Sequence, residues 1–259
     1  MNIFLIRHGQ SYGNIIGNKT KTIRGITDNT SLTPKGKKQI EKIAKNFSHQ
    51  KINLKKIFSS PLKRAYQSAL IFKKYYPKTQ IIIDENLKEI NFGEFERKKW
   101  EFIKDHYQDW LNKYLKNKFN TPYPKGESRK DLINRINFFI KKNLTDNDKN
   151  YLIITHEEVI RSFLSIFFNN QEYFFSRENL LKIENGKVNS VFFDKKLNHI
   201  YQINSDIPSV LNSNLFYLID NFLNENKIKK FFLNKNQTFS DNLVFTIFYK
   251  KNKLKILKI

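Results

Sequence analysis

The sequence contains no cysteine, so disulfide bonds and thiolate metal sites are excluded. It also lacks any run of about 18 apolar residues, the length that can span a bilayer as a helix. The opening segment MNIFLIRHGQ has neither the long apolar stretch nor the small-residue cleavage site of a signal peptide. These absences lead us to expect a soluble, cytoplasmic protein that has no membrane partner.

Acidic residues are few beside basic ones: 24 Asp and Glu stand against 47 Lys and Arg, a formal net charge of +23. Such a charge can indicate nucleic-acid binding. However, Lys, Asn, Ile and Phe crowd the whole chain, as a compositionally biased genome would produce. Arginine, which makes bidentate contacts with phosphates and bases, is scarce beside lysine. We therefore expect no nucleic-acid partner, although a positive surface would help to capture a phosphorylated substrate.

Hydrophobic residues make up 39% of the chain and aromatic residues 15%, which is too apolar for a disordered protein. Short apolar runs predict buried strands at residues 2–6, 56–60, 81–83 and 151–154. Helical spacing of apolar residues predicts helices after Thr33-Pro34 and over 62–75, 99–118, 128–142 and 159–168. A polar loop is expected from the first strand to about Ser31. The alternation predicts an α/β fold, a three-layer sandwich with a mostly parallel central sheet flanked by helices.

The last third of the sequence differs in pattern. Asn185-Gly186, between the apolar runs 179–184 and 188–193, predicts a β-hairpin that helps to complete a domain of residues 1–207. Residues 208–259 are expected to form a small C-terminal α+β extension of unknown role, with a helix at 210–222 and two or three strands. The sequence shows no internal repeat and no Gly/Ser linker.

A histidine and an arginine stand together where the first predicted strand ends, at Arg7 and His8, followed by Gly9 and, further on, Asn14. In open α/β sheets, ligand sites lie at the carboxyl ends of the strands. A neutral imidazole can attack phosphorus, and a guanidinium can hold two phosphate oxygens. This segment therefore predicts a phosphoryl-transfer site.

Three further residues follow predicted strands in the same way. Arg64 opens a helix, and a helix N-terminus with an arginine favours a bound anion. Glu89 has apolar neighbours, and partial burial would raise its pKa toward that of a general acid. His156 ends the strongest strand, as His8 ends the first. Each alone could be an ordinary surface or structural residue, so the interpretation depends on their combination.

The ordered motifs strand-RHGxSxxN, SPLxRA, LxEIxFGE, PxGES and strand-THxxVIR resemble the phosphatase branch of the histidine phosphatase (phosphoglycerate mutase-like) superfamily. The resemblance covers about residues 1–207 and leaves 208–259 outside. It implies that His8 is the phosphohistidine nucleophile. It also implies that Arg7, Arg64 and His156 form a phosphate clamp.

The same resemblance implies that Glu89 protonates the leaving group and then activates water. Asn14 is implied as a further phosphate contact, and Arg24, in RGITDNTSLTPKG, as a residue near the phosphate. The segment Gly126-Glu127-Ser128 is implied to be structural. No metal or other cofactor is expected, because the clamp itself supplies the positive charge that phosphoryl transfer needs.

Two segments depart from the family pattern. Glu157-Glu158 stands where the family often has Gly-Gly, and a carboxylate there would repel a dianion unless it points away or pairs with a basic residue. Glu157 is therefore a candidate substrate-binding residue, suited to a basic or hydroxyl-rich substrate portion. The frequent family segment WEG is replaced by Glu94-Phe95-Glu96-Arg97, without the glycine.

We expect metal-independent hydrolysis of a small phosphorylated metabolite through a phosphohistidine on His8. One alternative is mutase-type phosphoryl transfer, and another is a catalytically impaired phosphoester-binding protein, which Glu157-Glu158 would favour. Nucleic-acid binding driven by net charge is a third, which a steep salt dependence of binding would support. The sequence carries no code for the substrate and leaves the oligomeric state open, with a dimer as one option.

Overall fold

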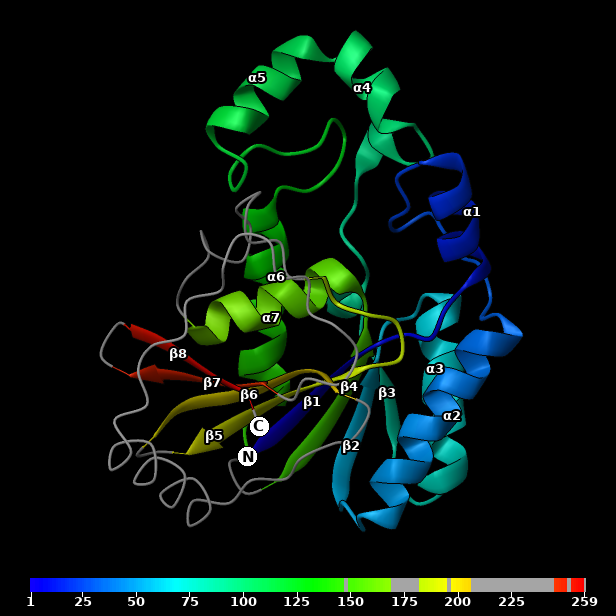
Figure 1. Cartoon of the computed structure of the whole chain (residues 1–259), viewed down its shortest axis with the longest axis vertical. Coiled ribbons are helices and arrows are strands. Elements are labelled where there is room, and N and C mark those ends of the chain that lie inside the picture. The colour runs from blue at the N-terminus through cyan, green and yellow to red at the C-terminus, as the bar shows by residue number, and fades with distance from the viewer. Residues whose placement is uncertain (147–148, 169–181, 195–196, 206–244, 251–252, 259) are drawn as a thin grey trace.

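A computed structural model of the chain describes residues 1–146, 149–168, 182–194, 197–205, 245–250 and 253–258 (Figure 1). Its centre is one sheet with the strand order β3-β2-β4-β1-β5-β6-β7-β8. The strands are β1 (Asn2–Arg7), β2 (Leu54–Ser59), β3 (Ile81–Ile83), β4 (Asn150–Thr155), β5 (Val188–Asp194), β6 (Leu197–Ser205), β7 (Phe245–Lys250) and β8 (Lys253–Lys258). Strands β1 to β4 are parallel, and β5 to β8 continue the sheet antiparallel.

Helices cover both faces of the parallel part of the sheet (Figure 1). Phe4 and Ile6 of β1 pack with α2 (Pro34–His49) and α3 (Lys63–Tyr75). The alternate residues Ile3 and Leu5 pack with α6 (Arg129–Asn143) and α7 (Glu157–Phe168). Because successive side chains of a strand point to opposite faces, one apolar strand contributes to two cores. The predicted three-layer α/β sandwich is confirmed.

The loop predicted from the first strand to Ser31 contains a helix, α1 (Tyr12–Thr20), so that prediction was wrong in part. The Ser11 side chain accepts from the Asn14 amide, and the Asn14 side chain accepts from the Ser11 amide. This reciprocal capping box starts the helix. Ile15 and Ile16 are exposed, so α1 has little of the apolar periodicity by which helices are found from sequence.

The helix predicted over 99–118 is two helices, α4 (Trp100–His106) and α5 (Gln108–Lys116), which meet at Tyr107 with φ −131° and ψ 44°. They stand beyond the end of the sheet, on the side where β1 and β4 end (Figure 1). Two short 3₁₀ turns, η1 (Glu85–Leu87) and η2 (Gly93–Phe95), lie on the path from β3 to α4.

The hairpin predicted around Asn185-Gly186 is only half present. Gly186 makes the turn, with φ +62°, but residues 182–184 are not in a strand, and 179–181 lie outside the described residues. Instead β5 pairs with β1 and with β6. The helix predicted at 210–222 also lies outside the described residues. Strands β7 and β8 extend the main sheet, and the boundary between 1–207 and 208–259 stays a prediction.

Among the helices of the described ranges, none is both long and apolar enough to cross a membrane.

Arg97, in the segment that lacks the glycine frequent in the resembling family, adopts a left-handed backbone with φ +66°. Replacing it with glycine is expected to raise the free energy of unfolding by about 0.5–1 kcal/mol, because glycine adopts this conformation without steric cost. Thermal unfolding should show Arg97→Gly more stable than the wild type. The control is Lys99→Gly, where φ is −74° and glycine should not stabilise. An unchanged or lower melting temperature for Arg97→Gly would contradict this explanation.

Candidate active site

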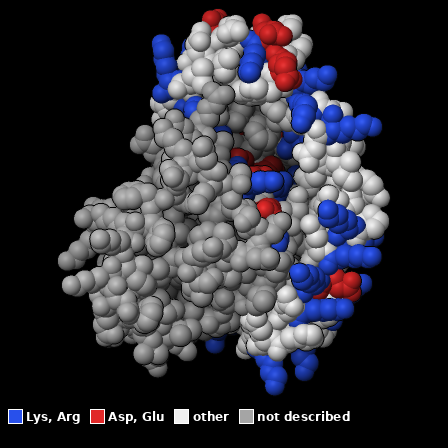
Figure 2. Space-filling model, in the orientation of Figure 1, with Lys and Arg blue, Asp and Glu red and all other residues white. Residues whose placement is uncertain are grey.

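The parallel strands bring His8 and His156 together. In the register of β1 with β4, Arg7 lies opposite Thr155, so the next residue of each strand is a histidine. The His8 amide donates to the Thr155 carbonyl (3.0 Å). The two imidazole rings are buried, with centroids 5.1 Å apart and planes inclined by 61°. In the space-filling view, basic and acidic side chains meet in a recess below the α4–α5 segment (Figure 2).

The tautomer of His8 is fixed by its two partners. His8 Nδ1 lies 2.8 Å from the Gly9 carbonyl oxygen, and Arg64 Nε donates to His8 Nε2 at 3.0 Å. A carbonyl only accepts and a guanidinium only donates, so Nδ1 carries the hydrogen and Nε2 presents its lone pair. Burial, followed by the charges of Arg64 and Arg7, holds the pKa of His8 well below 6.5. His8 is therefore neutral, with its lone pair on Nε2.

Arg64 lies near the start of α3 and is itself buried. Besides His8, its guanidinium donates to the carbonyls of Asp28 and Gly25. The loop that carries these carbonyls is organised by Glu96, whose carboxylate accepts from the amides of residues 26 (2.8 Å) and 27 (3.0 Å). Glu96, part of the segment that departs from the family pattern, thus helps to place the loop that holds Arg64.

Two nitrogens of the site are buried and have no hydrogen-bond partner within the described residues: Arg7 Nε and His156 Nδ1. His156 Nε2 lies 2.8 Å from Ser60 Oγ. Burial, then the charges of Arg64, His8 and Arg7, lowers the pKa of His156 well below 6.5. A buried polar atom without a partner costs free energy, and such atoms at a site indicate a ligand. Arg7 Nε–H, and His156 Nδ1 in the tautomer that carries its hydrogen there, suit an anionic oxygen.

Glu89 is 7% exposed and follows η1. Its Oε1 accepts from the Ile90 amide at 2.9 Å. Burial and then the nearby charge of Glu158 raise its pKa to about 7, against the lowering effects of the Ile90 amide, Arg64 and Arg7. The burial expected from the apolar neighbours of Glu89 is present. A carboxyl group with this pKa can give or take a proton near neutral pH.

Glu157 and Glu158 form ion pairs. Glu157 lies 2.7 Å from Arg7 Nη1 and 2.5 Å from Arg161 Nη2. Glu158 contacts Arg161 and lies 3.7 Å from Arg129 Nε. The repulsion expected of two bare carboxylates is thus offset by arginines. The sequence interpretation missed this role of Arg161, although acidic residues three and four positions before it on a helix are a readable signal.

The contacts described for the Arg7 guanidinium are made by Nη1. Its Nη1 donates to the Ile183 carbonyl (2.6 Å) and meets Glu157, whereas Nε is not bonded within the described residues. Contacts at Nη1 leave the edge that contains Nε available for an anion.

The remaining candidates differ in their placement. Asn14 Oδ1 accepts from the Ser11 amide (2.9 Å) and hydroxyl (3.1 Å), and within the described residues no hydrogen bond joins Asn14 to the two site histidines. Arg24 Nε donates to Thr22 Oγ1 (3.3 Å). Within the part of the chain that the structure describes, no hydrogen bond or ion pair joins Arg24 to the two site histidines.

Comparison with solved structures supports the fold. The α-ribazole phosphatase from Shigella flexneri superposes with a TM-score of 0.68, covering 82% of this chain and 100% of that one at 19% identity. This likeness concerns the fold alone.

Similar sequences are named as phosphatases. A Hydrogenobacter thermophilus protein called "Putative phosphoserine phosphatase 2" is 34% identical over 155 residues, 60% of this chain and 72% of the relative. The 6-phosphofructo-2-kinase/fructose-2,6-bisphosphatase 4 of Rattus norvegicus is 32% identical over 165 residues, 64% of this chain but only 32% of that protein.

The family itself is shown by a match that spans most of the chain. Residues 3–206 match the sequence model of the "Histidine phosphatase superfamily (branch 1)". That range contains both site histidines, the arginines beside them and Glu89. By this match the chain belongs to the histidine phosphatase superfamily, branch 1, as its motifs predict.

Proposed function

We propose that this chain is a phosphomonoesterase that hydrolyses small phosphorylated metabolites through a phosphohistidine on His8, without a metal ion. The observation that carries the proposal is the state of His8: buried, neutral, and with Nε2 facing the Arg64 guanidinium at 3.0 Å. Its membership of a phosphatase family supports the reaction class. The departures at Glu157 and Glu158 do not remove any group that the chemistry needs.

In the first step, His8 Nε2 attacks phosphorus, and the bond from phosphorus to the leaving oxygen breaks. Glu89 gives its proton to that oxygen, so the alcohol leaves neutral. Arg64 turns from Nε2 to the phosphoryl oxygens as the new P–N bond forms. Arg7, through Nε–H, and neutral His156, in the tautomer with its hydrogen on Nδ1, hold the other oxygens. Catalysis here is mainly positioning and dispersal of charge.

In the second step, the Glu89 carboxylate takes a proton from water. The hydroxyl attacks phosphorus, the P–N bond breaks, and inorganic phosphate leaves. Glu89 is again protonated and His8 Nε2 again has a lone pair. One residue serves as acid and then as base, which the pKa of about 7 allows.

The dependence of kcat/KM on pH for an alkyl phosphate should be bell-shaped. The first step needs neutral His8, whose lowered pKa places the acidic limb well below pH 6.5. It also needs protonated Glu89, so activity should fall as pH rises through about 7. Steady-state kinetics across about pH 5 to 8 would measure this. A flat profile, with chemistry rate-limiting, would contradict the pairing of His8 and Glu89.

The test of the function is phosphate release from p-nitrophenyl phosphate and a panel of phosphomonoesters, with a chelator present. The names of the similar sequences recommend phosphoserine and fructose 2,6-bisphosphate for the panel. Chelator-resistant release supports the proposal. If the folded protein releases no phosphate across about pH 4.5 to 8, the impaired phosphoester-binding alternative is favoured. Transfer of phosphate to a second acceptor without net release would favour a mutase.

A further inference from the structure

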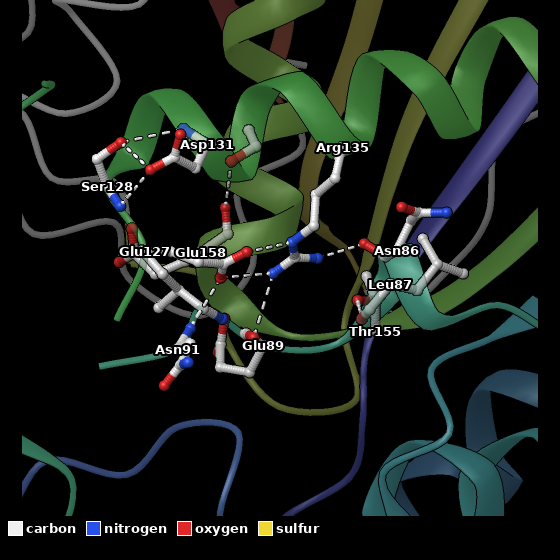
Figure 3. A network of polar contacts seen from close by, with 12 residues as sticks. Asn86, Leu87, Glu89, Asn91, Glu127, Ser128, Asp131, Arg135, Thr155 and Glu158 are labelled. Atoms are coloured by element: carbon white, nitrogen blue, oxygen red, sulfur yellow. Dashed lines mark hydrogen bonds and ion pairs between the residues drawn. The ribbon is translucent and has the colours of Figure 1, made fainter. Parts of the chain in front are cut away.

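Arg135, on α6, contacts the backbone of the segment that carries Glu89 (Figure 3). Its Nη2 donates to the Glu89 carbonyl at 3.2 Å, and its Nη1 donates to the Asn86 carbonyl. The same guanidinium makes a two-pronged contact with Glu127, through Nε (2.8 Å) and Nη2 (3.1 Å). Bidentate contacts of this kind fix the orientation as well as the position of a guanidinium.

Glu127, from the PxGES segment, also contacts the chain beyond Glu89. Its Oε2 accepts from the Asn91 amide at 2.9 Å, and its own amide donates to the Asn91 carbonyl at 2.9 Å. The two backbones are in close contact, because a Cβ added at Gly126 would lie 2.4 Å from the Asn91 carbonyl oxygen. Arg135 and Glu127 together therefore hold the backbone on both sides of Glu89.

A third contact comes from the strand that carries His156. Thr155 Oγ1 donates to the Leu87 carbonyl at 2.7 Å, so β4 also holds this segment (Figure 3). Residues 88–92 are in neither helix nor strand. Backbone groups that no ladder satisfies need side-chain partners, and the Arg135–Glu127 pair supplies them here. These two side chains are 17% and 24% exposed, so their contacts are largely screened from water.

The carboxyl group of Glu89 itself has few anchors. The hydrogen bond described for it comes from the amide of its neighbour Ile90. Its place relative to His8 Nε2 is therefore set by the backbone that carries it. General acid catalysis depends steeply on that geometry, because the proton must reach the leaving oxygen within hydrogen-bond distance.

We propose that Arg135 and Glu127 form a positioning clamp that places the Glu89 carboxyl at the leaving group. The inference rests on the proposed function, because it assumes that Glu89 is the acid. Neither residue touches the reacting atoms. Glu127, in the PxGES segment, thus affects the reaction by positioning Glu89. The family resemblance implied only a structural role for this segment.

The test compares two substrates that differ in their need for an acid. An alkyl phosphate such as glycerol 2-phosphate has a poor leaving group, whereas p-nitrophenolate leaves without a proton. Arg135→Lys should lower kcat/KM for the alkyl phosphate by about 10–100-fold, as a misplaced catalytic group does. For p-nitrophenyl phosphate it should lower kcat/KM by about twofold or less. Glu127→Gln, which keeps one acceptor oxygen, should show the same selectivity with a smaller loss.

The matched control is Lys125→Met, which removes the ion pair between Lys125 and Glu94 of η2 (2.6 Å). Among the described residues, no hydrogen bond or ion pair joins the Lys125 side chain to Arg135 or Glu127. This variant should leave the ratio of the two activities unchanged. Retained p-nitrophenyl phosphate activity shows that each variant folds. If Arg135→Lys does not fold, Glu127→Gln provides the test in its place. Equal losses on both substrates, or no loss on either, would overturn the clamp alone. A wild type inactive on both would instead overturn the proposed function.

Discussion

Replacing His8 with alanine is expected to lower kcat/KM for every phosphomonoester by about 10⁴-fold or more, as loss of a covalent nucleophile does in other enzymes. The variant lacks His8 Nε2, the atom that accepts the phosphoryl group in the proposed mechanism and that Arg64 Nε contacts at 3.0 Å. The cationic groups around it remain. His8→Ala should therefore still bind inorganic phosphate as a competitive ligand while it fails to turn over.

Labelled substrate provides the direct measurement. Rapid quenching of the wild type should trap a phosphoenzyme that is stable in alkali and lost in acid, as expected of a phosphoramidate, and His8→Ala should trap none. His49→Ala is the control, because His49 is an exposed histidine at the end of α2. Residual activity of His8→Ala within tenfold of the wild type would rule out the covalent route.

Replacing Glu89 with glutamine is the second large effect, and it should depend on the leaving group. For alkyl phosphates kcat/KM should fall by about 10²–10⁴-fold, the usual contribution of general acid catalysis. For p-nitrophenyl phosphate the fall should be about tenfold or less, because that leaving group needs no proton. Glutamine keeps the shape of the side chain and an acceptor for the Ile90 amide, so the fold should be unaffected.

The second step provides an independent measurement on the same variant. Loss of the base should slow hydrolysis of the phosphohistidine, so Glu89→Gln should release p-nitrophenol in a burst followed by a slower steady state. Its alkaline limb near pH 7 should also disappear, because the group with a pKa of about 7 is gone. Glu101→Gln, an exposed glutamate on α4, is the control. Equal losses for both substrates would refute the role of Glu89 as acid.

Much of the fold and the centre of the site could be predicted because their signals are local. Continuous apolar runs identified β1 and β4, and Thr33-Pro34 marked the start of α2, where the Thr33 side chain accepts from the Gly36 amide. Parallel strands end at one edge of a sheet, so residues that directly follow two such strands come together. That rule predicts His8 and His156 at the same edge, and the pairing of β1 with β4 in the structure makes them neighbours.

The features that sequence interpretation missed depend on partners distant in the chain or on caps without apolar periodicity. Arg135 and Glu89 are 46 residues apart, and nothing in either segment reveals their contact. Whether the charge of Glu157 would repel a phosphate could not be predicted, because its partner Arg7 lies 150 positions away in the sequence. In the structure the two side chains are 2.7 Å apart. The α1 helix was missed because Asn14 closes its capping box in place of the usual Glu or Gln.

The contact between Arg64 and His8 has a consequence for selectivity toward electrophiles. In the resting protein the lone pair of His8 Nε2 is occupied by the Arg64 N–H. A neutral electrophile does not attract the guanidinium away from Nε2. The imidazole should therefore react slowly with acylating and alkylating compounds that reach the recess. A phosphate dianion attracts the guanidinium and uncovers the lone pair in the same movement. In the proposed mechanism, the arginine that binds the substrate phosphate therefore also protects the nucleophile from other electrophiles.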